Sequence, residues 1–197
     1  MVDLMSLSAC PLDGVWTTGN FGRSGTTGLT IKRTTPISLV QLSLFPKDAL
    51  KVPAKLIKLG IKEFPANGMS HVEQSLSVLS LGAGRYLLES TEPEFFSKVQ
   101  KAVPAEVGST TDLSSARIVF TISGTAVETV LQKGIAMDFS LDAFPIGKVA
   151  QTTAHHLNVT VLRTDVERFR ISAFSTFARS AFDWLNASSL PHGLQRI

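Results

Sequence analysis

Apolar and polar residues alternate most regularly in the C-terminal third of the chain. Ile118, Phe120 and Ile122 lie at alternate positions, which is typical of a strand with one face in the core. Further segments of strand character follow at 148–154, 157–162 and 167–173. This third of the chain therefore predicts four strands.

Two helices are expected among these strands. Val127, Val130 and Leu131 fall on one face of the first, and Thr125 and Glu128 have the spacing of an N-terminal capping box. The second helix follows Ser175, its expected cap. Its apolar residues recur at helical spacing: Phe174, Phe177, Ala178, Ala181, Phe182 and Leu185.

The preceding part of the chain shows a similar order of elements. A strand at 37–44 leads to a helix at 46–59, which Pro53 should kink or divide. The lysines of this helix fall on one face, which we interpret as exposed to solvent: Lys47, Lys51, Lys55 and Lys58.

A loop is expected at 61–74, followed by two strands at 76–81 and 85–89 with a Gly-Ala-Gly turn between them. Thr91 and Glu94 repeat the capping-box spacing. They precede a helix whose apolar face is Phe95, Phe96 and Val99.

Residues 1–35 are rich in glycine and threonine and show little apolar periodicity, so we expect an irregular N-terminal arm. Trp16 and Phe21 are isolated aromatics in this arm. They could anchor the chain on another subunit or pack against its own core, and the sequence favours neither alternative.

These elements predict an α+β fold in which two units share the order strand, helix, two strands, helix. The units span residues 36–110 and 111–190, and the second adds a strand before its last helix. We expect them to form one compact domain as a pseudo-repeated pair.

Charge and composition narrow the class of protein. With 44% hydrophobic and 18% charged residues, the chain is globular. Its net charge is +3, but residues 61–115 carry seven acidic and four basic groups. Because no basic cluster with interleaved aromatics occurs, nucleic acid is not an expected partner. No apolar run approaches the length of a membrane span, and a cytoplasmic location is expected.

No catalytic, cofactor-binding or metal-binding residue is expected on this chain. His155 and His156 are adjacent on a strand or turn, so their rings should not converge on one metal ion. Asp138 and Asp142 could form a pair for acid–base chemistry, but they lie in a loop where aspartate commonly caps turns.

Arginines make the C-terminal third locally basic. Arg168 and Arg170 should share one face of a strand, and Arg179 lies on the closing helix. Arginine is enriched at protein interfaces, so these three residues, with Trp16 and Phe21, are the candidate subunit interface.

Four segments, in order, resemble the gamma subunit of heterotetrameric sarcosine oxidase. They are RIVFTISG at 117–124, VLQKGIAMD at 130–138, FPIGKVAQT at 144–152 and FARSAFDWL at 177–185. Two departures mark a divergent member: Ile135-Ala136 stands where the family has Cys-Pro, and residues 83–86 replace a "GPDEW" loop.

The resemblance implies a fold like the folate-binding domain of aminomethyltransferases and a structural role without catalytic groups. It implies a bacterial complex with larger alpha and beta subunits and a small delta subunit, which demethylates sarcosine oxidatively to glycine with tetrahydrofolate as one-carbon acceptor. The larger subunits would hold FAD, FMN, NAD and tetrahydrofolate.

Two alternatives remain open. The chain could bind tetrahydrofolate on its own, as repair proteins of the same fold do. It could also be the small subunit of a related enzyme that acts on another N-methyl amino acid, such as N-methylglutamate dehydrogenase.

Overall fold

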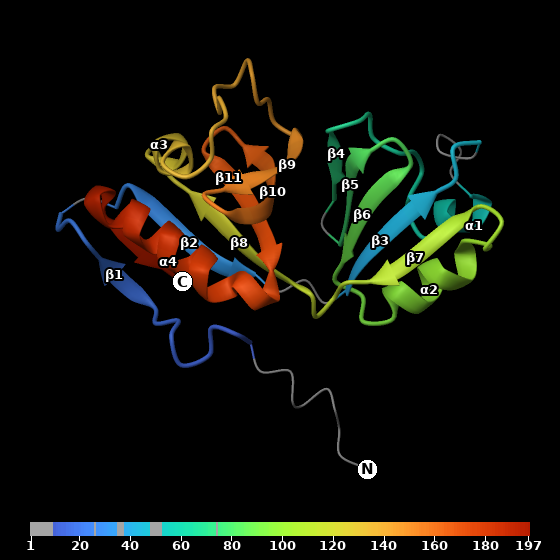
Figure 1. Ribbon diagram of the computed structural model, residues 1–197, viewed down its shortest axis with the longest axis horizontal. Helices are drawn as coiled ribbons and strands as arrows, with labels where there is room; N and C mark the ends of the chain where they lie inside the picture. Colours follow the sequence, from blue (N-terminus) through green and yellow to red (C-terminus); the bar gives the residue numbers. More distant parts are fainter. Residues whose placement is uncertain (1–9, 26, 35–37, 48–52, 74) are drawn as a thin grey trace, which may run out of the picture.

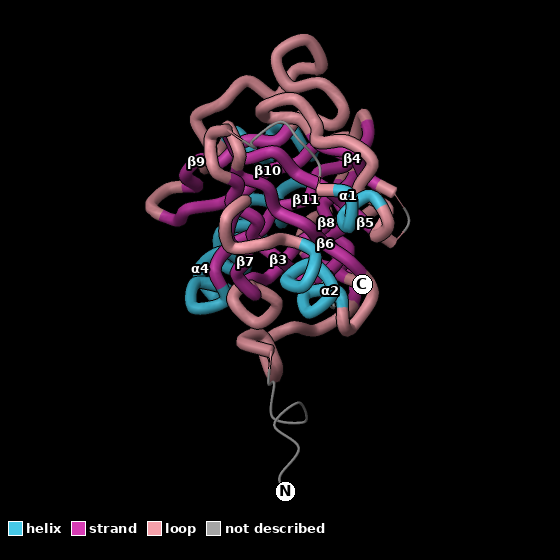
Figure 2. Tube along the Cα trace, turned by 90° about the vertical axis from the view of Figure 1, so that its right-hand side faces the viewer, coloured by secondary structure: helices cyan, strands magenta, loops and turns pink. Residues whose placement is uncertain are grey.

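The computed structural model describes residues 10–25, 27–34, 38–47, 53–73 and 75–197. Two β-sheets lie side by side, each with helices packed on its outer face (Figure 1). Figure 2, viewed from the side of α1 and α2, shows these two helices in front of the strands that they cover.

The five-stranded sheet comes from the first half of the chain and has the strand order β4-β5-β6-β3-β7. Its strands are β3 (Ser38–Leu44), β4 (Ser70–Val72), β5 (Leu76–Gly82), β6 (Arg85–Ser90) and β7 (Gly108–Asp112). Its helices are α1 (Ala54–Ile57) and α2 (Phe95–Ala102).

The seven-stranded sheet has the order β1-β12-β2-β8-β11-β10-β9. Its strands are β1 (Gly19–Phe21), β2 (Leu29–Thr34), β8 (Arg117–Ser123), β9 (Val149–Ala154), β10 (Leu157–Asp165), β11 (Arg168–Phe174) and β12 (Leu194–Arg196). Its helices are α3 (Val127–Gln132) and α4 (Ala178–Ser189).

The two sheets repeat one topology. Both follow the order strand, helix, three strands, helix, strand, so that β3 to β7 correspond to β8 to β12. The spatial order of the first sheet recurs in the second, with β2 inserted between β8 and β12 and β1 added outside β12. The predicted pair of units is therefore present, but the first unit has two strands that the sequence did not predict, β4 and β7, and the second unit also has β12.

The corresponding edge strands meet at the centre of the molecule. Met69, just before β4, bridges to Lys148, just before β9, and the amide of Val149 donates to Gly68 O at 2.8 Å. A small apolar cluster joins the facing sides of the sheets: Leu39, Leu79, Leu87, Val149 and Leu162. Each sheet also has a larger core of its own under its helices.

The strands predicted by alternation are confirmed, with ends that differ by a few residues. Residues 70–72, expected in a loop, form β4 instead. Residues 29–34, expected in an irregular arm, form β2, so that prediction is wrong for this segment. Leu29 and Ile31 are buried in the larger core, and β2 is held between β8 and β12. These long-range pairings place a segment from the glycine- and threonine-rich part of the chain in the sheet.

The predicted helix starts are wrong. No side chain caps α2, α3 or α4, and the N-cap positions are Glu94, Ala126 and Phe177. In the described part of the segment 46–59, α1 spans only Ala54–Ile57, and Lys51 lies outside the described residues. Where the chain is described, no helix has the length and apolar character required to cross a membrane.

Phe174 and Phe177 were predicted to belong to the apolar stripe of the closing helix, and both are exposed. A 3₁₀ turn at Ser175–Phe177 precedes α4, which changes the helical phase before Ala178. The later members of the stripe are buried as predicted: Ala178, Ala181, Phe182 and Leu185.

A buried arginine fixes the long connection between α3 and β9. Arg163 on β10 is only 1% exposed and lies over the ring of Phe169 at 4.8 Å. Its guanidinium donates to the carbonyls of Phe139 at 2.6 Å and Phe144 at 3.0 Å and to Glu128 at 2.7 Å. Glu128, predicted to cap its helix, therefore serves as an ion-pair partner instead.

Candidate subunit interface

The two isolated aromatics of the N-terminal segment pack on the chain's own core. The ring of Trp16 lies 6.2 Å from that of Phe120 and 5.5 Å from that of Phe182. The guanidinium of Arg196 lies over the ring of Phe21 at 3.4 Å. These contacts favour the second of the two alternatives, in which the aromatics pack against their own core.

The three candidate arginines have different surroundings. Arg168 is exposed beside Asp165, and Arg179 is exposed and pairs with Asp183 one helical turn away at 2.9 Å. Arg170 faces the other sheet and forms an ion pair with Glu89 of β6. The side chain of Arg170 is 19% exposed and that of Glu89 is 7% exposed. Arg170 therefore joins the two sheets within the chain.

The strand register divides the inner face of the seven-stranded sheet, the face opposite α3 and α4, into rows. The first row is Thr121, Arg170, Leu162 and Val149, of which Arg170, Leu162 and Val149 contact the five-stranded sheet. The second row is Val119, Ser172, Thr160 and Gln151. In the third, Arg117 lies beside Phe174, and Asn158 beside Thr153. This third row lies beyond the contact between the sheets.

An open groove of about 420 Å³ runs over the second and third rows. The described residues that line it carry no carboxylate: Arg117, Gln151, Thr152, Thr153, Asn158, Val159, Thr160 and Phe174. The guanidinium of Arg117 lies 4.1 Å above the ring of Phe174. Burial lowers the pKa of this guanidinium from its ordinary value, because removal from water disfavours the charged form.

Polar groups in and beneath this groove lack hydrogen-bond partners within the described chain. They are Nε of Arg117 and the hydroxyls of Thr160 and Ser172. Thr160 lines the groove although it is only 3% exposed. Buried polar groups of a folded protein are normally paired, so this concentration sets the groove apart from ordinary surface.

The groove ends at the edge strand β9. The amide of Val149 points away from β10, towards Gly68, and alternate residues of a strand direct their amides to the same side. The amides of Gln151 and Thr153 therefore also point away from β10, and both residues are exposed. β9 contains neither a charged residue nor a proline, the usual protections of an edge strand.

An exposed aromatic side chain borders this groove, and a second follows it closely in sequence. Phe174 forms part of its lining, and Phe177, three residues later, is 47% exposed. This groove was not predicted from the sequence. The alternation places Arg117 on the polar face of its strand, but it does not show which rows of that face the other sheet leaves uncovered.

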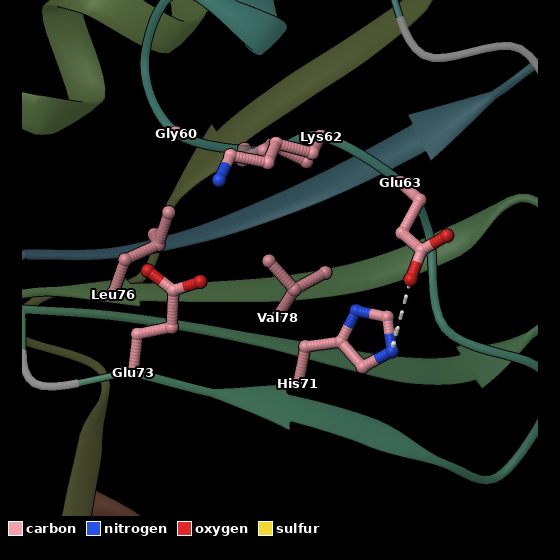
Figure 3. A pocket seen from close by; sticks show the side chains of 8 residues that line it. Gly60, Lys62, Glu63, His71, Glu73, Leu76 and Val78 are labelled. Carbon is pink, nitrogen blue, oxygen red and sulfur yellow. Dashed lines mark ion pairs between the residues drawn. The ribbon is translucent and has the colours of Figure 1, made fainter.

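A second groove, of about 450 Å³, lies beside β4 in the five-stranded sheet (Figure 3). Figure 3 shows Glu63 and His71 turned towards each other, with 3.7 Å between the carboxylate oxygen and Nε2. Glu73 and Lys62 also line this groove. Both members of the Glu63–His71 pair are exposed, so water screens their interaction.

Of the four residues considered for metal binding or catalysis, His155 and Asp138 have structural roles, and His156 and Asp142 are exposed. His155 takes a positive φ of 52° in the two-residue turn between β9 and β10, and its ring meets that of Trp184 edge-on. Asp138 accepts from the amide of Ser140 at 2.8 Å, which lowers the pKa of its carboxyl. Within the described residues, no group of three or more His, Cys, Asp or Glu side chains is arranged to hold a metal ion.

Known proteins resemble this chain in sequence and in fold, although no family model matches it. Over 110 residues it is 30% identical to the sarcosine oxidase subunit gamma of Corynebacterium sp. (strain U-96). The match covers 55% of this chain and 54% of that relative, so the chain spans about half the length of the relative it matches.

Two solved structures share the fold. A chain of heterotetrameric sarcosine oxidase from Corynebacterium sp. U-96 superposes with a TM-score of 0.74 and 22% identity, covering 86% of this chain and 89% of that one. Aminomethyltransferase T of the glycine cleavage system from Bartonella henselae superposes with a TM-score of 0.62 and 13% identity. The superposition covers 87% of this chain and 48% of that one. The resemblance predicted from the four segments is thus confirmed: the chain is similar in sequence to a sarcosine oxidase gamma subunit and has the α+β fold shared with aminomethyltransferases.

Proposed function

We propose that this chain is a non-catalytic small subunit of a sarcosine-oxidase-type complex, which converts sarcosine to glycine with tetrahydrofolate as one-carbon acceptor. The observation that carries the proposal is the sequence match to a gamma subunit, together with the fold shared along most of the chain. The role of the chain is to support its larger partners.

The proposal places the redox and folate chemistry on the other subunits. FAD, FMN, NAD and tetrahydrofolate would be bound by the alpha and beta chains, with a small delta chain completing the assembly. The structural roles of Asp138 and His155 agree with this division, because each side chain already serves the fold. Arg168 and Arg179 remain candidates for subunit contacts, since both are exposed.

Co-expression with the candidate large subunits tests the proposal. We expect a yellow complex that contains this chain, and we expect the chain alone to bind no flavin and to be poorly soluble. The measurements are size-exclusion chromatography, the visible absorption spectrum and sarcosine turnover. A complex that assembles and turns over normally without this chain would contradict the proposal.

The same material separates the two alternatives. Binding of tetrahydrofolate to the isolated chain, measured by calorimetry, would favour a stand-alone folate-binding protein, which the gamma-subunit match does not favour. If the complex oxidises another N-methyl amino acid faster than sarcosine, its substrate differs while the role of this chain stays the same.

A further inference from the structure

The groove over Arg117 places a positive charge where the chain supplies no counter-charge. Among the described residues, no carboxylate lies within ion-pair distance of Arg117, and none lines the groove. On the same sheet, Arg163 and Arg170 both have a glutamate partner, whereas Arg117, like the buried Arg196, has no ion-pair partner among the described residues. Because a partly desolvated charge is costly without a partner, Arg117 is suited to an acidic group from outside the chain.

The guanidinium of Arg117 can also donate hydrogen bonds to such a group. Nε of Arg117 and the hydroxyl of Thr160 are buried and without partners, and both residues line the groove. A carboxylate has two oxygens that can accept several hydrogen bonds, so one acidic side chain can pair with the guanidinium of Arg117. A guanidinium and a carboxylate also match in shape, which makes arginine well suited to this contact.

The surroundings of the groove favour a protein as the source of the carboxylate. Phe174 adds exposed aromatic surface to the groove, Phe177 three residues later is also exposed, and aromatic side chains are enriched in protein interfaces. At the edge of the sheet, the outward amides of Gln151 and Thr153 on β9 can donate to a neighbouring backbone. A small carboxylate would use the charge of Arg117 but neither of these flanking features.

We propose that this groove receives an acidic side chain, Asp or Glu, from a segment of a larger subunit that lies across the inner face between Phe177 and β9. The proposal rests on the function proposed above and specifies where the partner binds. It assigns Arg117 as the central contact.

Substitution of Arg117 in the co-expressed complex tests this assignment. Arg117→Met should weaken co-purification of the large subunit by roughly 30-fold or more, because one member of a buried charge pair is lost. Arg117→Lys, which keeps the charge but not the paired donors, should give an intermediate loss. Arg85→Met is the matched control, since Arg85 is an exposed arginine of the other sheet.

A photo-crosslinking residue at Thr153 tests the position of the partner without removing Arg117. We expect crosslinks to a large-subunit peptide that contains Asp or Glu. The same label at Thr111, on the edge strand β7 of the other sheet, should give none. Because this label leaves the charged contact intact, the result is informative even if Arg117→Met fails to fold.

The outcomes distinguish this inference from the proposed function. If the unmodified chain forms no complex with the large subunits, the proposed function fails, and this inference fails with it. If the complex forms, but Arg117→Met assembles like Arg85→Met and Thr153 gives no crosslink, the inference alone is overturned. It is also overturned if a small carboxylate compound is retained through Arg117 while assembly is unchanged.

Discussion

Three arginines of the seven-stranded sheet show how position decides the role of one residue type. Arg163 points into the core and binds backbone carbonyls and Glu128. Arg170 points to the other sheet and pairs with Glu89, whereas Arg117, further along the same inner face, has no acidic partner in the described chain. The sequence predicted a locally basic region, but only the packing separates these three environments.

At the residue scale, Arg163→Met should destabilise the fold by about 3 kcal/mol or more, because the carbonyls of Phe139 and Phe144 lose their buried donor. Glu128→Gln should cost less than Arg163→Met, about 1–2 kcal/mol, because the amide oxygen still accepts from the guanidinium although the buried Arg163 loses its counter-charge. Urea unfolding of both variants checks this. Similar losses for the two would show that the ion pair, and not the carbonyls, holds the connection.

At the scale of elements, periodicity predicted strands better than helices. Ile118, Phe120 and Ile122 alternate along a strand and all lie in the core under the helices, so their pattern reports the local geometry. The helices are short, and their starts depend on the preceding turn. In the closing helix, the 3₁₀ turn changes the phase and leaves Phe177 at the surface. Thr91 and Thr125 have the residue type and spacing of a capping box, yet neither side chain caps its helix.

The packing of α3 against α4 requires a glycine. A Cβ at Gly134, two residues after α3, would clash with the indole ring of Trp184 on α4. Gly134→Ala should therefore cost about 1–3 kcal/mol by overpacking. Trp184→Phe should relieve part of this loss, so a double-mutant cycle by thermal unfolding should give a favourable coupling of about 1 kcal/mol. Additive effects would mean that the two positions do not interact.

At the scale of the whole molecule, the sheets are joined by few contacts compared with the core of each. The junction consists of the small leucine and valine cluster, the bridge between Met69 and Lys148, and the pair of Glu89 and Arg170. The pair comes from β6 and β11, which are corresponding strands of the two units. An interaction across the pseudo-symmetric centre thus fixes how the units face each other.

Arg170→Met tests this junction, because it leaves the carboxylate of Glu89 in a mostly buried position. We expect a loss of about 2–4 kcal/mol, near the cost of breaking a buried ion pair. Arg168→Met, two residues away on the same face but exposed, should change stability by less than about 0.5 kcal/mol. Denaturant unfolding of the two variants provides the comparison. Equal free energies of unfolding would show that the ion pair does not stabilise the junction.

The sequence by itself determined most of the strands, the order of elements in the two units and the resemblance to a gamma subunit. These properties depend on the alternation of apolar and polar residues and on the order of short segments. Both can be observed without knowing which distant residues meet. The tertiary structure alone decided that residues 29–34 join the sheet, that Phe174 and Phe177 are exposed, and that Arg170 has a partner while Arg117 lines an open groove. Each of these outcomes depends on residues far apart in sequence, because burial and charge pairing are set by which surfaces meet.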